Sequence, residues 1–74
     1  MRYGKVLDHY IKQAGISRAE LARRIGVSRG QITELINGET KEPGLTRAKN
    51  IADALGVSLN DMLDMMFEKN DEEE

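Results

Sequence analysis

Apolar residues follow a helical period along nearly the whole chain. They recur at intervals of three and four residues, which places them on one face of a helix, and the alternation typical of strands is absent. The pattern predicts five helices, at residues 4–14, 18–25, 29–37, 45–55 and 59–67. The side chains expected to face the core are Val6, Leu7, Tyr10, Ile11, Ala14, Leu21, Ala22, Ile25, Ile32, Leu35, Ile36, Leu45, Ala48, Ile51, Ala52, Leu55, Met62, Leu63 and Met66.

Three of the expected helix junctions have the same form, a glycine, a β-branched aliphatic residue and a serine: Gly15-Ile16-Ser17, Gly26-Val27-Ser28 and Gly56-Val57-Ser58. The glycine closes one helix in the left-handed conformation, and the serine accepts a hydrogen bond from the first turn of the next. A long polar residue stands three positions after each serine. This spacing predicts capping boxes with Glu20 and Gln31 and a weaker aspartate version with Asp61.

The middle junction carries the functional prediction. It joins two short helices across a minimal turn, which forces them to cross steeply, as in a DNA-reading helix-turn-helix. Ala22 is small enough to stand where the helices cross. The apolar side of 29–37 packs inward, and the polar side remains outside: Arg29, Gly30, Thr33, Glu34 and Asn37, with Gln31 at the margin.

Charge is distributed unevenly along the chain. Residues 1–60 contain ten Lys or Arg against six Asp or Glu, whereas residues 61–74 contain one against seven. The net charge of −2 therefore hides a mildly basic body and an acidic end. We expect one domain at residues 1–67 and a disordered acidic tail at residues 68–74.

Composition argues against several classes of protein. There is no cysteine and only one histidine, His9, so no metal site is expected. The chain offers no nucleophile–base set, no catalytic residues and no phosphate-binding glycine loop, so we expect neither an enzyme nor a cofactor. No apolar run is long enough to span a membrane and no signal peptide is present, which predicts a cytoplasmic protein without a membrane partner.

Residues 16–63 resemble the DNA-binding domains of phage repressors and Cro proteins, the Xre-type helix-turn-helix family. The resemblance rests on strings found in order and at matching spacings: Ser17-Arg-Ala-Glu-Leu-Ala22, Ile25-Gly-Val-Ser-Arg29, Ile32, Leu35, Asn37-Gly38, Pro43 and Ile51-Ala-Asp-Ala-Leu-Gly-Val-Ser58. It implies an all-α fold, a compact five-helix lambda-repressor-like domain whose second and third helices form the helix-turn-helix.

The resemblance also implies how DNA would be bound, with helix 29–37 in the major groove. The implied base-reading residues are Arg29, Gly30, Gln31, Thr33 and Glu34. The implied phosphate contacts are Ser17, Arg18, Ser28, Asn37, Thr40 and Lys41. Arginine pairs with guanine, glutamine with adenine and glutamate with cytosine, and a threonine methyl contacts thymine. Gly30 either brings the backbone close to DNA or marks a missing base contact.

Two features depart from the family pattern. The position of Arg18 is usually glutamine, which orients a neighbouring reader on the recognition helix. The loop at Glu39-Thr40-Lys41-Glu42, often basic in phage repressors, is nearly neutral here.

The last helix predicts a partner surface. Met65 and Phe67 remain after the inward face is filled, and relatives pair through this end, so we expect a homodimer through Met62, Met65, Met66 and Phe67. The predicted function is a sequence-specific, repressor-like regulator that binds double-stranded DNA at a palindromic operator. The alternative is a protein-interaction module, or an antitoxin-type autoregulator, that binds a protein partner through its acidic tail or last helix.

Overall fold

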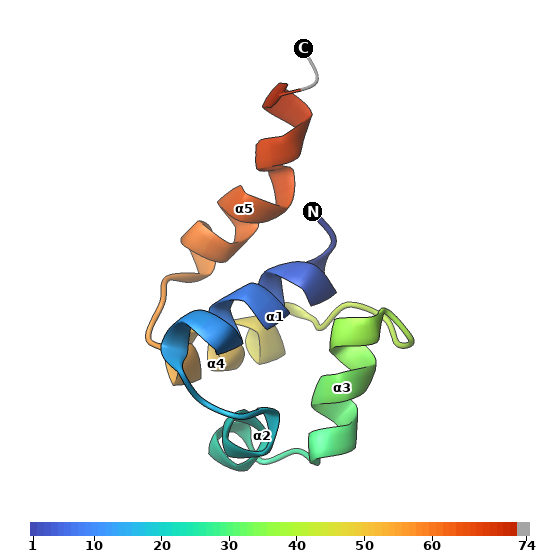
Figure 1. Ribbon diagram of the computed structural model, residues 1–74, viewed down its shortest axis with the longest axis vertical. Coiled ribbons are helices and arrows are strands. Elements are labelled where there is room, and N and C mark those ends of the chain that lie inside the picture. Colours follow the sequence, from blue (N-terminus) through green and yellow to red (C-terminus); the bar gives the residue numbers. More distant parts are fainter. Residues whose placement is uncertain (73–74) are drawn as a thin grey trace.

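The computed structural model describes residues 1–72, with the side chains of residues 1–67, and its helices are joined by short connections (Figure 1). Five helices and no strand occur in that part of the chain: α1 (Tyr3–Ala14), α2 (Arg18–Ile25), α3 (Arg29–Asn37), α4 (Leu45–Leu55) and α5 (Leu59–Glu72). The predicted helices are therefore present, with α1 starting one residue earlier. Helix α5 runs beyond the predicted end at Phe67. The side chains and last residues of the predicted acidic tail, 68–74, lie outside the described residues, so its disorder stays a prediction.

The three serine junctions cap their helices as predicted. Ser17, Ser28 and Ser58 Oγ accept hydrogen bonds from the backbone nitrogens three residues later, at 3.0, 3.1 and 3.0 Å. The glycines before them are in the left-handed region, with φ of 73°, 77° and 74°. Because each cap satisfies an otherwise unpaired backbone group, these junctions fix where the helices begin and end.

Only one of the two expected capping boxes is complete. Ser28 N donates to Gln31 Oε1 at 2.9 Å, which closes the reciprocal pair at the start of α3. The predicted box at Ser17 is wrong, because the Glu20 carboxylate turns instead to two arginines of its own helix, Arg23 and Arg24. Three hydrogen bonds from cationic guanidinium groups replace the single bond from a backbone N–H.

All five helices contribute to one core. One side chain from each has no exposed surface: Leu7, Leu21, Ile32, Ile51 and Met62. Helices α2 and α3 pack on each other, and α1 contacts α3, α4 and α5. Figure 1 shows α2 and α3 at one end of the molecule and α5 at the other, with α1 between the two ends. The core therefore holds one side of α3 and leaves its other side exposed.

Several predicted core positions are wrong. Leu45 is 79% exposed because it is the first residue of α4, and the buried stripe starts one turn later at Ala48. Ala14 is exposed at the last turn of α1. On α5, Leu63 is half-buried but does not pack on the core, whereas Met65 does. The inward face of α5 is thus rotated relative to the expected one.

Helix α1 packs very closely on the end of α3. A Cβ added to Gly4 would overlap the carbonyl oxygens of Leu35 and Ile36, so only glycine allows this approach. The preceding Tyr3 is 3% exposed and joins the core. Gly4 therefore determines how near α1 lies to the C-terminal end of α3.

Candidate nucleic-acid interface

The predicted base-reading residues lie on the outer side of α3. Arg29, Gly30, Gln31 and Glu34 are exposed and Thr33 is half-buried, whereas Ile32 between them is fully buried. Arg29 forms no ion pair with any residue whose side chain is described. Its guanidinium is therefore available to a ligand in front of the helix.

Gln31 has a structural task that limits its chemistry. Its side-chain oxygen accepts from Ser28 N at 2.9 Å, and its own backbone nitrogen donates to Ser28 Oγ. Bidentate pairing with adenine needs both ends of the glutamine amide. With the oxygen engaged in the capping box, only the amide nitrogen remains for a base.

Arg18 connects three helices beside the recognition surface. Its Nη1 donates to Thr33 Oγ1 at 3.3 Å, and its Nη2 lies 3.8 Å from Asp8 Oδ1 of α1. Asp8 Oδ2 also forms an ion pair with Lys12 Nζ at 3.0 Å. The arginine that replaces the usual glutamine thus contacts one of the predicted readers directly.

A groove of about 320 Å³ lies between α3, the loop at residues 38–44 and the start of α4. Four of the predicted site residues line this groove together: Gln31, Glu34, Thr40 and Lys41. Arg47 of α4 also lines it, and the sequence analysis missed this residue. An exposed arginine one turn after the loop was the available signal. Two cations, Lys41 and Arg47, therefore line the same groove as Glu34.

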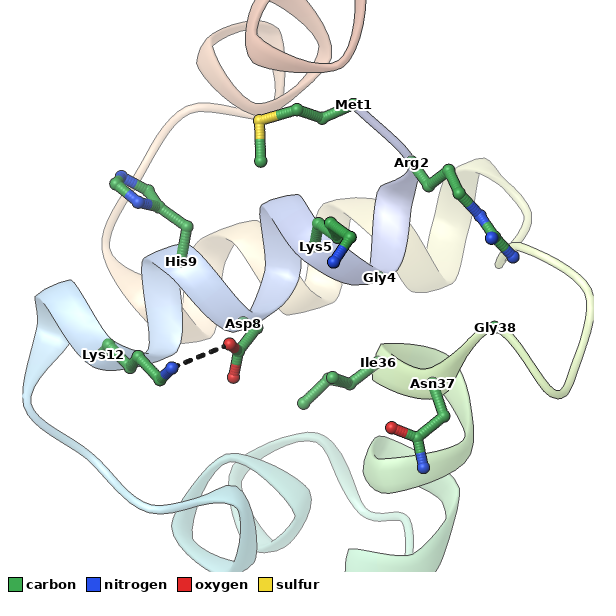
Figure 2. Close-up of a pocket in the computed structure, with 10 residues that line it drawn as sticks. All are labelled: Met1, Arg2, Gly4, Lys5, Asp8, His9, Lys12, Ile36, Asn37 and Gly38. Atoms are coloured by element: carbon green, nitrogen blue, oxygen red, sulfur yellow. Dashed lines mark ion pairs between the residues drawn. The ribbon is translucent and has the colours of Figure 1, made fainter.

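A second, larger groove of about 580 Å³ lies along α1 beside its contact with the C-terminal end of α3 (Figure 2). Asn37 is the one predicted site residue that lines it, and the cations Arg2, Lys5 and Lys12 come from α1 or the residue before it. The sequence analysis treated residues 4–14 only as a core helix. The recurrence of Lys5 and Lys12 seven residues apart, on one helix face, was the signal for this surface.

Two further arginines belong to the scaffold. Arg23 Nη2 and Arg24 Nε donate to Glu20 Oε2 at 2.6 and 2.9 Å, and these hydrogen bonds, from Arg23 first, lower the pKa of the Glu20 carboxyl. Arg24 Nη1 also donates to the Ala54 carbonyl at 2.9 Å, near the end of α4. The bond from Arg24 to Ala54 joins α2 to α4. Both arginines are paired, whereas Arg29 has no ion pair with a residue whose side chain is described.

Tyr3 is a buried phenol at the start of α1. Its hydroxyl has no hydrogen-bond partner among the described residues. Burial, with a smaller effect of the Glu42 charge, raises the pKa of Tyr3 to about 12. The phenol therefore stays neutral under ordinary conditions and acts as a core side chain.

The described residues hold no group of three or more His, Cys, Asp or Glu side chains arranged to bind a metal ion. None of the helices in the described part of the chain has both the length and the apolar character required to cross a membrane.

Comparison with known proteins defines the class. The helix-turn-helix family model HTH_3 matches residues 9–62. The clp gene regulator ClgR from C. glutamicum is similar in structure, with a TM-score of 0.78 and 32% identity over 84% of this chain and 79% of that one. SinR, a master regulator for biofilm formation solved in complex with DNA, gives a TM-score of 0.76 and 26% identity over 84% of this chain and 98% of SinR.

SinR is similar again in its complex with the SinI protein, with a TM-score of 0.77 and 26% identity over 93% of this chain and 66% of that one. The fold is that of a helix-turn-helix regulator. The chain belongs to the Cro/C1/Xre-type helix-turn-helix family of DNA-binding transcriptional regulators. The family and the five-helix fold expected from the sequence are thereby confirmed.

Proposed function

We propose that this protein is a sequence-specific regulator that binds double-stranded DNA by placing α3 in the major groove. The observation that carries the proposal is the exposed side of α3, which is rigidly capped at Ser28 and fixed from behind by Ile32. Cations stand on both sides of it, at Arg18 and at Arg47. A structural neighbour, SinR, is solved in complex with DNA, which supports the same use of the fold here.

The roles proposed for α3 follow from side-chain chemistry. Arg29 pairs with guanine, Thr33 offers its methyl group to thymine, and Glu34 accepts from the amino group of cytosine. Gly30 brings the backbone close to the base edges, and Gln31 contributes only through its amide nitrogen. Arg29, Thr33 and Glu34 therefore supply most of the sequence preference.

Phosphate contacts position the helix without reading sequence. We assign them to the N-terminal ends of α2 and α3, at Ser17, Arg18 and Ser28, where backbone N–H groups favour anions. Asn37, Thr40 and Lys41 complete the set on the other side of the recognition helix. The loop contributes Thr40 and Lys41 from the 320 Å³ groove.

The proposed active form is a homodimer on a palindromic operator, with half-sites about 34 Å apart. Helix α5 offers the surface, because Phe67 is 59% exposed and Met65 and Met66 are half-buried. Met62, originally predicted for the interface, has no exposed surface and belongs to the core. Leu63, on the same side of the helix as Phe67, takes its place in the proposal.

In vitro selection from a random duplex library tests the proposed function. The wild-type chain should enrich a palindrome, and Arg29→Ala should lose discrimination at one position of each half-site. Arg23→Ala is the matched control, because Arg23 is exposed and pairs with Glu20 on α2. No enrichment by a folded wild-type chain would contradict the proposal.

Binding of a protein partner is the second candidate function. The exposed Phe67 favours it, and SinR, a structural neighbour, is also solved in complex with another protein, SinI. An interaction module or an antitoxin-type autoregulator of this fold would use α5 or the acidic end. Salt dependence separates the two functions, since binding to DNA through several phosphates weakens steeply as salt is added.

A further inference from the structure

We infer that the groove between α1 and the end of α3 binds a phosphate of the DNA backbone, so that the DNA interface extends onto α1. This inference rests on the proposed function and adds residues that the family resemblance did not indicate. The groove, called the α1 groove below, is lined by three cations, Arg2, Lys5 and Lys12, and by one carboxylate, Asp8.

Part of the positive charge in the α1 groove has no partner among the residues whose side chains are described. A helix ends with unpaired carbonyls that cations can stabilise. At the end of α3, however, backbone nitrogens already satisfy two of these carbonyls, with Gly38 N donating to Leu35 O at 3.2 Å and Glu39 N to Glu34 O at 2.9 Å. Lys5 is exposed and forms no ion pair with a residue whose side chain is described. The positive charge is therefore available to an external anion.

The α1 groove adjoins the recognition surface. Asp8 lies between Lys12 at 3.0 Å and Arg18 at 3.8 Å, and Arg18 donates to Thr33 of α3. Asn37 borders the groove on the α3 side, as Figure 2 shows. A DNA strand whose phosphates contact Arg18 and Asn37 would pass across this groove.

The loop after α3 carries less positive charge than the α1 groove. The loop after α3 has one cation, Lys41, and two carboxylates, Glu39 and Glu42. A nearly neutral loop holds phosphates weakly. The three cations from the start of the chain supply charge that the loop lacks, on the other side of the same helix end.

Asp8 is the one carboxylate among the cations that line the α1 groove. In the free protein its carboxylate neutralises Lys12 and approaches Arg18. A phosphate entering the groove replaces Asp8 as the partner of these cations. Removal of the carboxylate should therefore strengthen DNA binding, whereas removal of Lys12 should weaken it.

The experiment measures binding of the full chain to a fluorescent mixed-sequence duplex of about 20 base pairs, at salt concentrations from about 50 to 200 mM. Lys5→Gln and Lys12→Gln should each reduce the slope of log K against log salt, and the double variant should reduce it by about 0.9, the value for one phosphate. Asp8→Asn should bind more tightly than wild type. Lys49→Gln is the matched control, because Lys49 is exposed and pairs with Asp53 on α4, outside the groove.

The outcomes separate the inference from the proposed function. If wild type binds with a steep salt slope and both groove variants behave like Lys49→Gln, the inference is overturned and the proposed function stands. If Lys12→Gln and Asp8→Asn change affinity in the same direction, the pair is only structural, which also overturns it. If folded wild type does not bind DNA, the proposed function itself fails. Thermal unfolding by circular dichroism confirms that each variant is folded.

Discussion

Arg18 donates a hydrogen bond from Nη1 to Thr33 Oγ1 across 3.3 Å, linking the first residue of α2 to the middle of α3. Thr33 is half-buried and faces the proposed DNA surface beside Glu34. The hydrogen bond fixes the orientation of the threonine hydroxyl and therefore of its methyl group. An arginine thus contacts a predicted base reader from the position where the family usually has glutamine, and it also approaches Asp8 of α1.

A double-mutant cycle tests this link. Arg18→Ala and Thr33→Val should each weaken binding to the selected duplex, and the double variant should lose less than the sum. We expect a coupling free energy of about 1 kcal/mol, the usual net value of a hydrogen bond. Thr33→Ser keeps the hydroxyl and should preserve the coupling. Strict additivity of Arg18→Ala and Thr33→Val would show that the hydrogen bond is absent in the complex.

Gly30→Ala separates protein stability from DNA binding. An added Cβ meets only Ser28 Oγ at 3.8 Å, so the protein itself tolerates it. Alanine favours the helix by up to about 1 kcal/mol, and urea unfolding should show higher stability. Affinity for the selected duplex should fall by about tenfold, equal to about 1.4 kcal/mol, because the methyl group occupies the space of a base edge. Unchanged affinity would mean that the backbone at position 30 does not approach DNA.

Gln31→Ala should reduce stability more than base preference. The variant loses the reciprocal bond to Ser28 N, and the free energy of unfolding should fall by about 1 kcal/mol, as for other cap losses. Gln31→Glu retains an oxygen acceptor at this position and should recover the stability. Repeating the selection with the alanine variant should return the wild-type sequence preference. A changed preference at one operator position would restore Gln31 as a full base reader.

Tyr3 should make stability fall at alkaline pH. Its pKa is raised from 10.0 to about 12 in the folded protein, so the unfolded chain loses this proton first. Between about pH 10 and pH 12 the folded state binds more protons than the unfolded state, and stability decreases as pH rises. Urea unfolding across this range should show a smaller decrease for Tyr3→Phe than for wild type, with Tyr10→Phe as control. Equal decreases would contradict the shift.

Helix boundaries were predictable from sequence because their causes are local. A glycine in the left-handed region determines where a helix ends, and a serine whose Oγ accepts from the backbone nitrogen three residues later determines where the next one starts. This reasoning placed the junctions at Gly26-Val27-Ser28 and Gly56-Val57-Ser58 correctly. It failed at Glu20, where nearby arginines compete for the carboxylate.

The parts of the candidate site that were missed depend on contacts between distant segments. The approach of α1 to α3 at Gly4 creates the α1 groove, and no local pattern indicates that these helices cross there. Arg47 joins the recognition side only because the loop returns α4 beside Glu34. Leu45 was misplaced for a related reason, since helical spacing does not show where a helix first reaches the core.

Arg24 shows that net charge is an incomplete description of this surface. Its guanidinium donates to Glu20 and to the Ala54 carbonyl at once, through two differently placed nitrogens. A lysine would carry the same charge, yet its single ammonium group lacks the planar, divergent donors that reach both acceptors. Arg24→Lys would keep the charge and still lose one of these two hydrogen bonds, which weakens the link between α2 and α4. Whether a substitution is tolerated at this position therefore depends on the shape of the cation and not only on its sign.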